Sequence, residues 1–248
     1  MNEFIRNAVE KDVLLPIKLA GQFHGVLQLC LRQCQREAQA RFDRGEKSWE
    51  LEQLRHIDDR IKLSYHGPAV QMDVMHWPNT SEKFYSVDMV PMIEIPRGND
   101  ESEYYVAKPI KRLTSHQDAW RKSFSLEEKR RLVTADKDNG CRKQVFRVLK
   151  VIRNREAGLM QLTSYHLKTA LLRTMDQQSK WGTDFLGQRM MDVIGQLEKD
   201  LDNGDMRNYY LPEVNLLQGI GDDAVLNMHN RLKRMMQSEQ EMMKLLRQ

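Results

Sequence analysis

The sequence is poor in cysteine, glycine and proline, and each shortage excludes a class of protein. Three cysteines among 248 residues cannot form a disulfide framework, which favours a reducing, intracellular setting. Thirteen glycines and seven prolines are too few for a collagen-like chain or a long low-complexity linker. Because 40% of the residues are apolar, the chain can build a core, and a disordered protein is excluded.

Long apolar runs are missing as well. The first twelve residues, MNEFIRNAVEKD, are charged and lack the apolar centre of a signal peptide. The most apolar stretch, residues 13–31, contains Pro16, Lys18 and His24, whereas a membrane-spanning helix needs about 20 mostly apolar residues. We therefore predict a cytoplasmic or nuclear protein that has no membrane partner.

A mild overall charge conceals a strongly basic block. The chain has 39 Lys and Arg against 35 Asp and Glu, a net charge of +4. Residues 108–155 contain fifteen of these basic residues and five acidic ones, so that this block alone carries +10. Such a block is typical of a protein that binds a phosphate-bearing ligand. A solvated helix face that binds nothing would give the same count.

Apolar periodicity predicts an α+β fold in which a strand-rich part precedes a helical part. Helical spacing recurs over residues 13–42, 141–155, 164–176, 184–202 and 222–247. Between them, 43–62 is expected to be a polar connection with a short charged helix. Period-two patterns predict two strands, over 69–76 and 84–95. The last helix is rich in methionine, and this spacing favours a core or a partner-facing surface over a cofactor site.

Two cysteines stand four residues apart on the apolar face of the first predicted helix. Cys30 and Cys34 could in principle share a metal ion, but no matching pair of His or Cys residues follows them. We therefore predict that both are buried packing residues.

One acidic residue interrupts the second predicted strand. Asp88 lies between Val87 and Met89, on the side opposite the apolar face of the strand. An aspartate buried at such a position needs charged partners or a metal, whereas one on a solvent-facing side needs neither. The residues alone leave both interpretations open.

The chain resembles the cyclic GMP-AMP synthase-like receptors and the related male-abnormal (Mab-twenty-one) proteins. The resemblance runs from about residue 13 to residue 236 and rests on six strings in the family's order: GPAVQMDV, YSVDMVPMIEIP, AWRKSFSLEEKRRL, CRKQVFRVLKVIR, LTSYHLKTALL and YYLPEVNLL. It implies a spine helix and a nucleotidyltransferase lobe in residues 1–108, followed by a helical lobe in residues 109–248. It further implies ATP or GTP held in the cleft between these lobes and joined into a cyclic dinucleotide.

The same resemblance implies a metal site, of which this chain shows only a part. The family holds two magnesium or manganese ions with three carboxylates, and Asp88 matches the third of them. The other two lie on a strand that precedes the spine helix, after a Gly-Ser turn, and neither has a counterpart here. Glu50 and Glu52 look similar but follow the spine helix, and Asp73 on the neighbouring strand, which could face Asp88, is a single carboxylate. We therefore predict an incomplete metal site and a chain that is inactive by itself.

The nucleotide-binding positions are better matched. By resemblance, Arg121 contacts a base with Ser123 beside it, Lys150 contacts phosphate, Ser164 lies near phosphate and Tyr165 stacks on a base. From the residues alone, Tyr165 can equally be a core tyrosine whose hydroxyl is satisfied, and Lys150 a solvated helix lysine.

A zinc site is not predicted. The DNA-sensing vertebrate member holds zinc with one His and three Cys near the CRK string, but here Cys141 has no nearby cysteine. Double-stranded RNA then becomes a better candidate than double-stranded DNA. It would be recognised by its shape and phosphates through a basic face. The candidate residues for this face are Lys129, Arg130, Arg131, Arg142 and Lys143.

Three functional hypotheses follow from these observations. The first is an innate-immune enzyme that makes a cyclic dinucleotide when nucleic acid binds. The second is a non-catalytic family member that binds a nucleotide or a protein partner. The third is a fragment, or natural short form, of an active enzyme, and this hypothesis agrees with the missing carboxylates. The sequence does not predict the oligomeric state.

Overall fold

The protein divides into two compact units, Met1–Phe124 (unit 1) and Ser125–Gln248 (unit 2). The boundary expected between residues 108 and 109 lies outside the described residues. The computed structural model describes residues 9–10, 13–66, 69–76, 83–98, 101–107 and 120–247.

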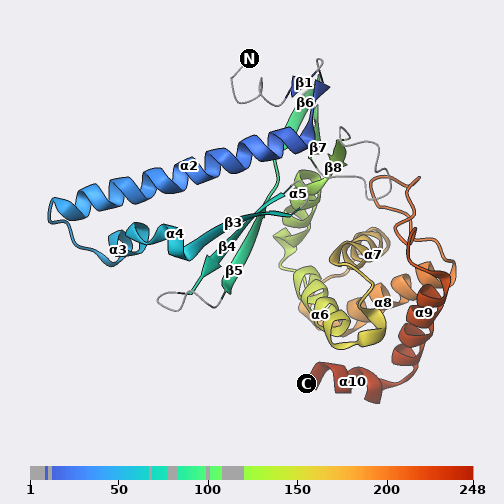
Figure 1. Ribbon diagram of the computed structural model, residues 1–248. Helices are drawn as coiled ribbons and strands as arrows, with labels where there is room; N and C mark the ends of the chain where they lie inside the picture. The colour runs from blue at the N-terminus through green and yellow to red at the C-terminus, as the bar shows by residue number, and fades with distance from the viewer. Residues whose placement is uncertain are drawn as a thin grey trace. The chain divides into compact units, whose positions relative to one another are not determined.

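Unit 1 is built on one long helix, α2 (Pro16–Asp43), as Figure 1 shows. Its proline is in the first turn, where the missing N–H breaks no helical hydrogen bond. Two short helices, α3 (Trp49–Arg55) and α4 (Ile57–Arg60), pack against α2. They replace the single short charged helix that the sequence predicted before residue 62.

The buried side of α2 is not the one that the sequence predicted. Leu19, Ala20 and Ala38 are buried, whereas Cys30 and Cys34 are exposed. The prediction of buried packing cysteines was therefore wrong. Ala20 and Ala38 stand about five turns apart on one side of the helix, and the cysteines lie on the flank of that side. A helix with apolar residues around more than half its circumference does not show which part will be covered.

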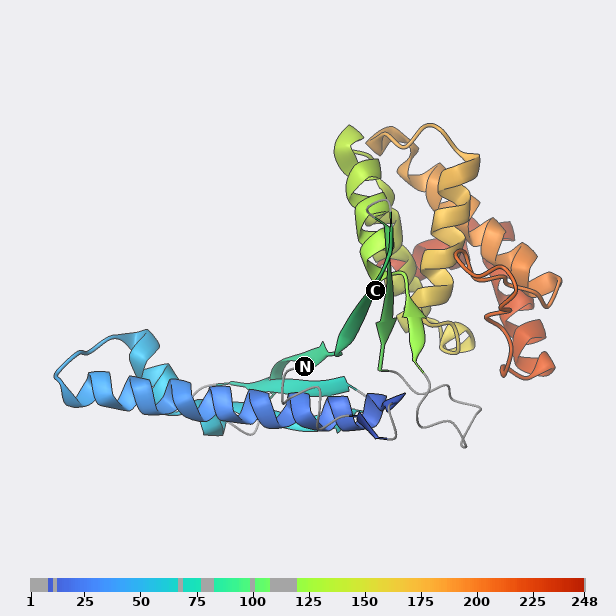
Figure 2. The same cartoon turned by 90° about the horizontal axis from the view of Figure 1, so that it is seen from above.

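The first sheet of unit 1 lies along α2, as Figure 2 shows. The ring of His24 on α2 stacks on the ring of Tyr65 with their centroids 4.5 Å apart. Val70 and Val74 are buried on one face of the central strand, and Ala69 and Met75 are buried on the other. The sheet is antiparallel, and its strands in spatial order are β3 (Ile61–His66), β4 (Ala69–Met75) and β5 (Lys83–Met89).

The stretch predicted as one strand, 84–95, is two strands in two different sheets. Pro91 lies between them and has no N–H to donate to a strand ladder, so the chain leaves the first sheet there. The second sheet is also antiparallel and consists of β6 (Met92–Gly98), β7 (Glu101–Val106) and β8 (Arg121–Ser123). Of these strands, β7 and β8 had no sequence prediction, and neither had β3.

A short antiparallel pair, β1 (Val9–Glu10) and β2 (Val13–Leu14), precedes α2. The indole N–H of Trp120 donates to the carbonyl of Leu14 over 3.0 Å, which ties the residue before β8 to this pair. Trp120 therefore connects segments of unit 1 that are far apart in the sequence.

Unit 2 is helical. Its apolar core lies between the helices, and Val145, Leu149 and Ile152 on one face of α6 are buried as the sequence predicted. The helices are α5 (Ser125–Ala135), α6 (Arg142–Arg155), α7 (Ser164–Gln177), α8 (Leu186–Asp202), α9 (Asp222–Gln237) and α10 (Glu239–Arg247), with the single-turn helices η1 (Asp136–Asp138), η2 (Ala157–Leu159) and η3 (Thr183–Phe185).

The predicted helix over 222–247 is broken in two. Ser238 between α9 and α10 has extended backbone angles, and its hydroxyl accepts the N–H of Glu241 over 3.3 Å. Serine is a favoured N-cap, so this residue ends one helix and begins the next. Met228, Met235 and Met242 are buried in the core, which confirms the core interpretation of the methionine pattern.

The architecture is α+β, with small antiparallel sheets and a long helix followed by an all-helical region, as the sequence predicted. Within the described ranges, no helix combines the length and the apolar character that a membrane span requires.

Candidate functional site

Two of the candidate positions lie at the N-terminus of α7, where a capping box fixes that end of the helix. The hydroxyl of Thr163 accepts the N–H of Tyr165 over 3.3 Å, and His166 Nδ1 accepts the N–H of Thr163 over 2.8 Å. Threonine is a good N-cap, and here a histidine takes the place of the usual Glu or Gln three residues later. Ser164 and Tyr165 are therefore the first two residues of α7.

Both ring nitrogens of His166 are engaged in hydrogen bonds. Its Nδ1 accepts a backbone N–H, so the proton must lie on Nε2, which is 3.1 Å from the carbonyl of Leu216 and donates to it. Burial lowers the pKa of His166. The imidazole is thus neutral and joins α7 to the loop before α9, which makes it a structural group.

A cation from α6 reaches the same helix end. Arg153 donates from Nη1 to the carbonyl of Leu162 over 2.9 Å and from Nη2 to the hydroxyl of Ser164 over 3.4 Å. Lys150 lies three residues before Arg153, so both project from one side of α6. Lys150 Nζ is 5.0 Å from the ring centroid of Phe146. The structure therefore brings Arg153 to Ser164 and places Lys150 on the same side of α6.

Sequence reasoning missed Arg153. It belongs to the same CRKQVFRVLKVIR string as Lys150, three residues further along, and that helical spacing was the available signal. A helix N-terminus with a guanidinium and a hydroxyl beside it has the chemistry of a phosphate site, because N–H groups and positive charges both stabilise phosphate oxygens.

Tyr165 is half-buried and is tied to the loop after α8. Its hydroxyl donates to Asn208 Oδ1 over 3.3 Å, and Lys168 Nζ lies 5.9 Å from its ring centroid. The same Asn208 oxygen accepts the backbone N–H groups of Tyr210 and Leu211. This hydrogen bond agrees with the core-tyrosine interpretation, while base stacking on Tyr165 stays a prediction.

The predicted nucleic-acid face is partly used inside the protein. Arg142 is buried and donates to Asp138 Oδ1 over 2.6 Å and to the carbonyl of Ala135 over 2.8 Å. Its guanidinium also lies over the ring of Trp181. Arg142 therefore holds the turn before α6 together, and its guanidinium is turned to protein groups.

The other four residues of that face differ among themselves. Arg131 pairs with Asp176, and its guanidinium carbon is 5.2 Å from the ring centroid of Tyr209. Lys143 pairs with Asp136. The remaining two, Lys129 and Arg130 on α5, are exposed.

Cys141 is fully buried, and burial raises the pKa of its thiol. Its backbone N–H donates to the carbonyl of Trp181 over 2.6 Å, next to the Arg142 contacts. A thiol in such surroundings is held in its neutral, weakly nucleophilic form.

In unit 1, Asp88 is exposed on β5, and its register partner on β4 is Gln71. Asp73 is paired in register with Ser86, so it does not face Asp88 directly across the hairpin as the sequence suggested. Asp73 lies 2.8 Å from Lys83 Nζ and accepts the Ser86 hydroxyl over 2.6 Å, and these contacts lower its pKa to about 2.

The described residues do not assemble the family's metal site. Nowhere in the described ranges do three His, Cys, Asp or Glu side chains gather closely enough to hold a metal ion. Glu50 and Glu52 lie on α3, as the sequence suggested, and Glu52 pairs with Arg55 over 2.8 Å. Asp88 alone matches the family pattern, and one carboxylate does not fit two metal ions.

Two residues of β8 complete the set of sequence predictions. Arg121 is exposed and Ser123 is half-buried, and they pair in register with Val106 and Tyr104 of β7. Their contact with a base stays a prediction from the resemblance.

Comparison with protein-family models matches two regions of the chain. Residues 1–133 match the Mab-21 protein nucleotidyltransferase domain. Residues 141–234 match the Mab-21 protein HhH/H2TH-like domain. The second match begins at Cys141, one residue before α6, and ends within α9.

Three curated relatives illustrate the range of similar proteins. Cyclic GMP-AMP synthase-like receptor 3 of Stylophora pistillata is 34% identical over 200 residues, which cover 77% of this chain and 57% of the relative. A cyclic GMP-AMP synthase-like receptor of Magallana gigas is 30% identical over 165 residues, 63% of this chain and 28% of that protein. Mitochondrial dynamics protein MID51 of Danio rerio is 29% identical over 140 residues, 56% of this chain and 29% of that protein. The chain thus spans little more than half the length of the first relative and under a third of the other two.

Proposed function

Because the chain belongs to the Mab-21 family, whose members contain a nucleotidyltransferase domain, we propose that unit 2 binds the phosphate groups of ATP or GTP at the N-terminus of α7. One observation carries the proposal: Ser164, the first residue of α7, accepts a hydrogen bond from Arg153, and Lys150 lies three residues before Arg153 on α6.

The chemistry of these groups supports the proposal. The planar guanidinium of Arg153 can share its donors between Ser164 and a phosphate oxygen, and Lys150 supplies a point charge on a long stem. The N–H groups at the start of α7 add the positive end of the helix dipole. In this proposal the ring of Tyr165 offers an aromatic face to a purine, and its hydroxyl bond to Asn208 fixes the ring's orientation.

A titration at two salt concentrations tests this site. Lys150→Glu should weaken ATP and GTP binding by roughly tenfold or more and flatten the salt dependence, because a phosphate contact is lost and a repulsive charge is added. Lys180→Glu makes the same charge change at an exposed position elsewhere in unit 2 and should have little effect. If the wild type binds neither nucleotide at low salt, the proposal fails.

Tyrosine variants separate stacking from structure. Tyr165→Ala should weaken nucleotide binding by about 1–3 kcal/mol with little change in salt dependence. Tyr165→Phe keeps the ring and loses the hydroxyl that bonds to Asn208, so it should retain most of the affinity. Equal losses in the two variants would assign Tyr165 to the packing of the loop and not to a base.

We also propose that this chain, by itself, makes no cyclic dinucleotide. The family's chemistry relies on divalent metal ions, magnesium or manganese, and only Asp88 of the three expected carboxylates has a match in the sequence. The test is incubation with ATP, GTP, either metal ion, and RNA or DNA. A cyclic product that disappears in Asp88→Asn would contradict the proposal and show that other carboxylates complete the site.

The match of Asp88 alone among the family's three metal carboxylates favours a second candidate function, a non-catalytic family member that binds a nucleotide or a protein partner. If a chain of the relatives' full length binds a nucleotide and makes no cyclic product, this candidate is favoured over the enzyme.

For nucleic acid, Lys129 and Arg130 are the candidate residues whose exposure suits a phosphate backbone. A double charge reversal, Lys129→Glu with Arg130→Glu, should weaken binding of double-stranded RNA and leave ATP binding at the α7 site unchanged. Unchanged RNA binding would exclude this face.

A further inference from the structure

A cavity of about 560 Å³ lies on unit 2 between α9 and the single-turn helix η2. Its volume is in the range of small-molecule sites, about 300–1,000 Å³. No residue of the proposed α7 site lines it. The lining residues are Glu156, Gly158, Asn227, Asn230, Arg231, Lys233, Arg234 and Gln237.

The wall contributed by α9 is a polar stripe. Each of Asn227, Asn230, Arg231, Arg234 and Gln237 is three or four residues from another member of the set, so they share one side of the helix. This stripe contains amide groups and guanidinium groups and no carboxylate. The only acidic residue in the lining is Glu156, which precedes η2.

Arg231 is already neutralised within the protein. Its Nη2 is 2.7 Å from Glu156, and its Nη1 bonds to Glu241 of α10. Burial alone would raise the pKa of Glu156, but hydrogen bonds from Arg231 and from the N–H of Gly158 outweigh burial and lower it. Glu156 is therefore ionised, and Arg231 serves as a brace between three segments of unit 2.

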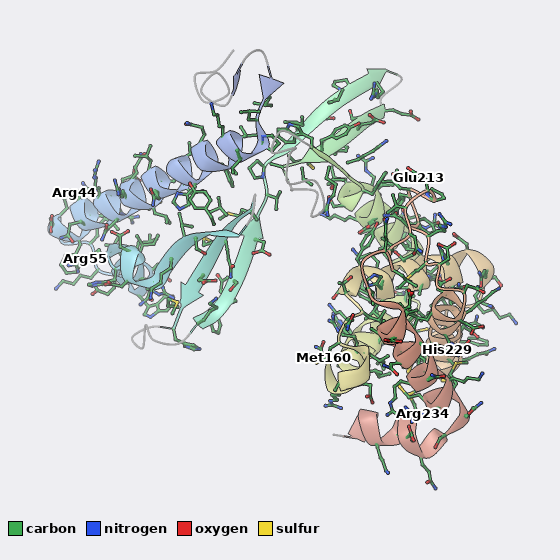
Figure 3. The ribbon with its side chains drawn as sticks, turned by 45° about the vertical axis from the view of Figure 1, so that its right-hand side comes forward. Arg44, Arg55, Met160, Glu213, His229 and Arg234 are labelled. Carbon is green, nitrogen blue, oxygen red and sulfur yellow. The ribbon has the colours of Figure 1, made fainter. Side chains whose placement is uncertain are left out.

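The other two cations of the cavity form no close ion pair of that kind, although Arg234 acts on Glu156 at longer range and helps to lower its pKa. Among the described residues, no carboxylate oxygen lies within 4.0 Å of the charged nitrogens of Lys233 or Arg234. Figure 3 labels Arg234 near the C-terminal end of α9. Three basic residues and one acidic residue line the cavity, and this excess of positive charge creates a local potential that favours an anion.

We propose that this cavity binds a small phosphorylated molecule, at a site separate from the one at α7. Lys233 and Arg234 would hold its phosphate oxygens, and the amides of Asn230 and Gln237 would donate further hydrogen bonds. The ionised Glu156 accepts a hydrogen bond from a hydroxyl or amino group of the ligand. The same carboxylate would repel a continuous phosphate backbone, which favours a small ligand over a nucleic-acid duplex.

The alternative is that these cations only stabilise α9. Basic residues near a helix C-terminus interact favourably with the helix dipole, and Arg234 lies in the last turn of α9. In that case replacing Arg234 would change stability slightly and would leave anion binding unchanged. The two interpretations therefore differ in one measurable quantity.

The experiment uses the full chain carrying Lys150→Glu, which silences the proposed α7 site. Calorimetric titration with inorganic triphosphate, ATP and a short RNA duplex gives three affinities. We expect triphosphate and ATP to bind, and Arg234→Gln added to this background should weaken both about tenfold. Arg234→Lys should recover part of the loss, because it restores the charge. Lys244→Gln, an exposed lysine of α10 outside the cavity, is the matched control and should change neither affinity.

Other outcomes overturn the inference. If the Lys150→Glu chain binds neither triphosphate nor ATP, or if Arg234→Gln leaves both affinities unchanged, the cavity is not a phosphate site. If RNA alone binds and Arg234→Gln weakens it, the surface belongs to a nucleic-acid interface instead. Failure of the α7 proposal would give a different result. In that case, adding Lys150→Glu to the Arg234→Gln variant would leave the ATP affinity unchanged.

Discussion

Units 1 and 2 have equal lengths but very different cores. A continuous cluster of buried apolar residues extends through unit 2, from Cys141 on the N-terminal side of α6 to Met242 on α10. In the described part of unit 1 the buried apolar residues are fewer, and four of them are alanines: Ala20, Ala38, Ala69 and Ala107. Burial of large side chains supplies most of the stabilisation of a domain, so the described part of unit 1 has less to hold it together.

The surfaces differ in the opposite sense, because more apolar side chains are exposed in the described part of unit 1 than in unit 2. Among the described residues, twelve of the eighteen exposed large apolar side chains belong to unit 1, including Leu29 on α2 and Phe84 on β5, which are 64% and 61% exposed. Strand β5 carries apolar residues on both faces, and its side chains are exposed at six of seven positions. The comparison teaches that an apolar pattern produces a buried face only where an opposing element supplies the other half of the contact.

One truncation in each unit gives the largest expected difference in the free energy of unfolding. Leu171→Ala in α7 should lower the free energy of unfolding of unit 2 by about 2–5 kcal/mol, because Leu171 is 1% exposed and its loss leaves a cavity. Val87→Ala in β5 should change stability by less than about 0.5 kcal/mol, since Val87 is 37% exposed. Hydrogen exchange of α7 and β4 peptides reads each unit separately. Equal losses would contradict the difference in core quality.

Breaking an ion pair should also destabilise unit 2 more than unit 1, by less than the core substitution does. Asp200 is buried, and both of its oxygens are 3.0 Å from Arg173 Nη1, so Arg173→Ala leaves a buried carboxylate without its main partner. Because the head of Arg173 is partly exposed, we expect a loss of about 2–3 kcal/mol, below the range for fully buried pairs. In unit 1, Arg97 and Glu103 are paired in solvent, and Arg97→Ala should have a much smaller effect.

A companion variant checks the reason for that loss. Burial raises the pKa of Asp200 even though Arg173 opposes the shift. Asp200→Asn removes the buried charge and retains a hydrogen-bond acceptor, so it should be tolerated better than Arg173→Ala. A larger loss in Asp200→Asn would mean that the ion pair itself, and not the unpaired charge, stabilises unit 2.

The sequence predicted the helices of unit 2 closely for the same physical reason. The face of α6 with Val145, Leu149 and Ile152 is opposed by other apolar helices of the same unit, so periodicity and burial agree. The division of the last helix was missed because Ser238 lies in a run of polar residues, 237–241, that also suits the exposed part of a continuous helix. Its effect depends on the bond from Glu241, which periodicity does not contain.

In unit 1 the sequence pattern predicted less. A period of two continues through Pro91, so 84–95 resembles one strand although the chain changes sheets there. At the candidate site, the resemblance identified Ser164 and Lys150, while Arg153 became evident only from its contact with Ser164. The internal role of Arg142 was also missed, because a basic residue in a basic block looks exposed until its partner Asp138 is placed.

Acidification should weaken unit 2 through His166. Burial lowers its pKa in the folded chain, so the unfolded chain, with an ordinary pKa of about 6.5, binds more protons in the range below that value. The contribution of His166 is complete above about pH 6.5 and declines as the pH falls toward the folded pKa. His166→Gln cannot titrate, so its stability should fall less steeply between pH 7 and pH 5. Parallel curves for wild type and variant would contradict the assignment of a buried, neutral imidazole.

The smallest expected effect tests how charge is held in unit 1. The Asp73 carboxyl is partly exposed to solvent. Its pKa is lowered to about 2, first by the hydrogen bond from Lys83 and then by that from Ser86. A lowered pKa means that its contribution to stability is present above about pH 4 and is lost as the pH falls through 2. NMR titration of the side-chain carboxyl carbon measures this directly. Lys83→Ala should move the pKa of Asp73 back toward its ordinary value of 3.8 by more than Ser86→Ala does, with little change in overall stability. If Asp73 titrated near 4 in the wild type, the polar face of β4 and β5 would be a loosely solvated surface, and the contrast with the buried pairs of unit 2 would become sharper.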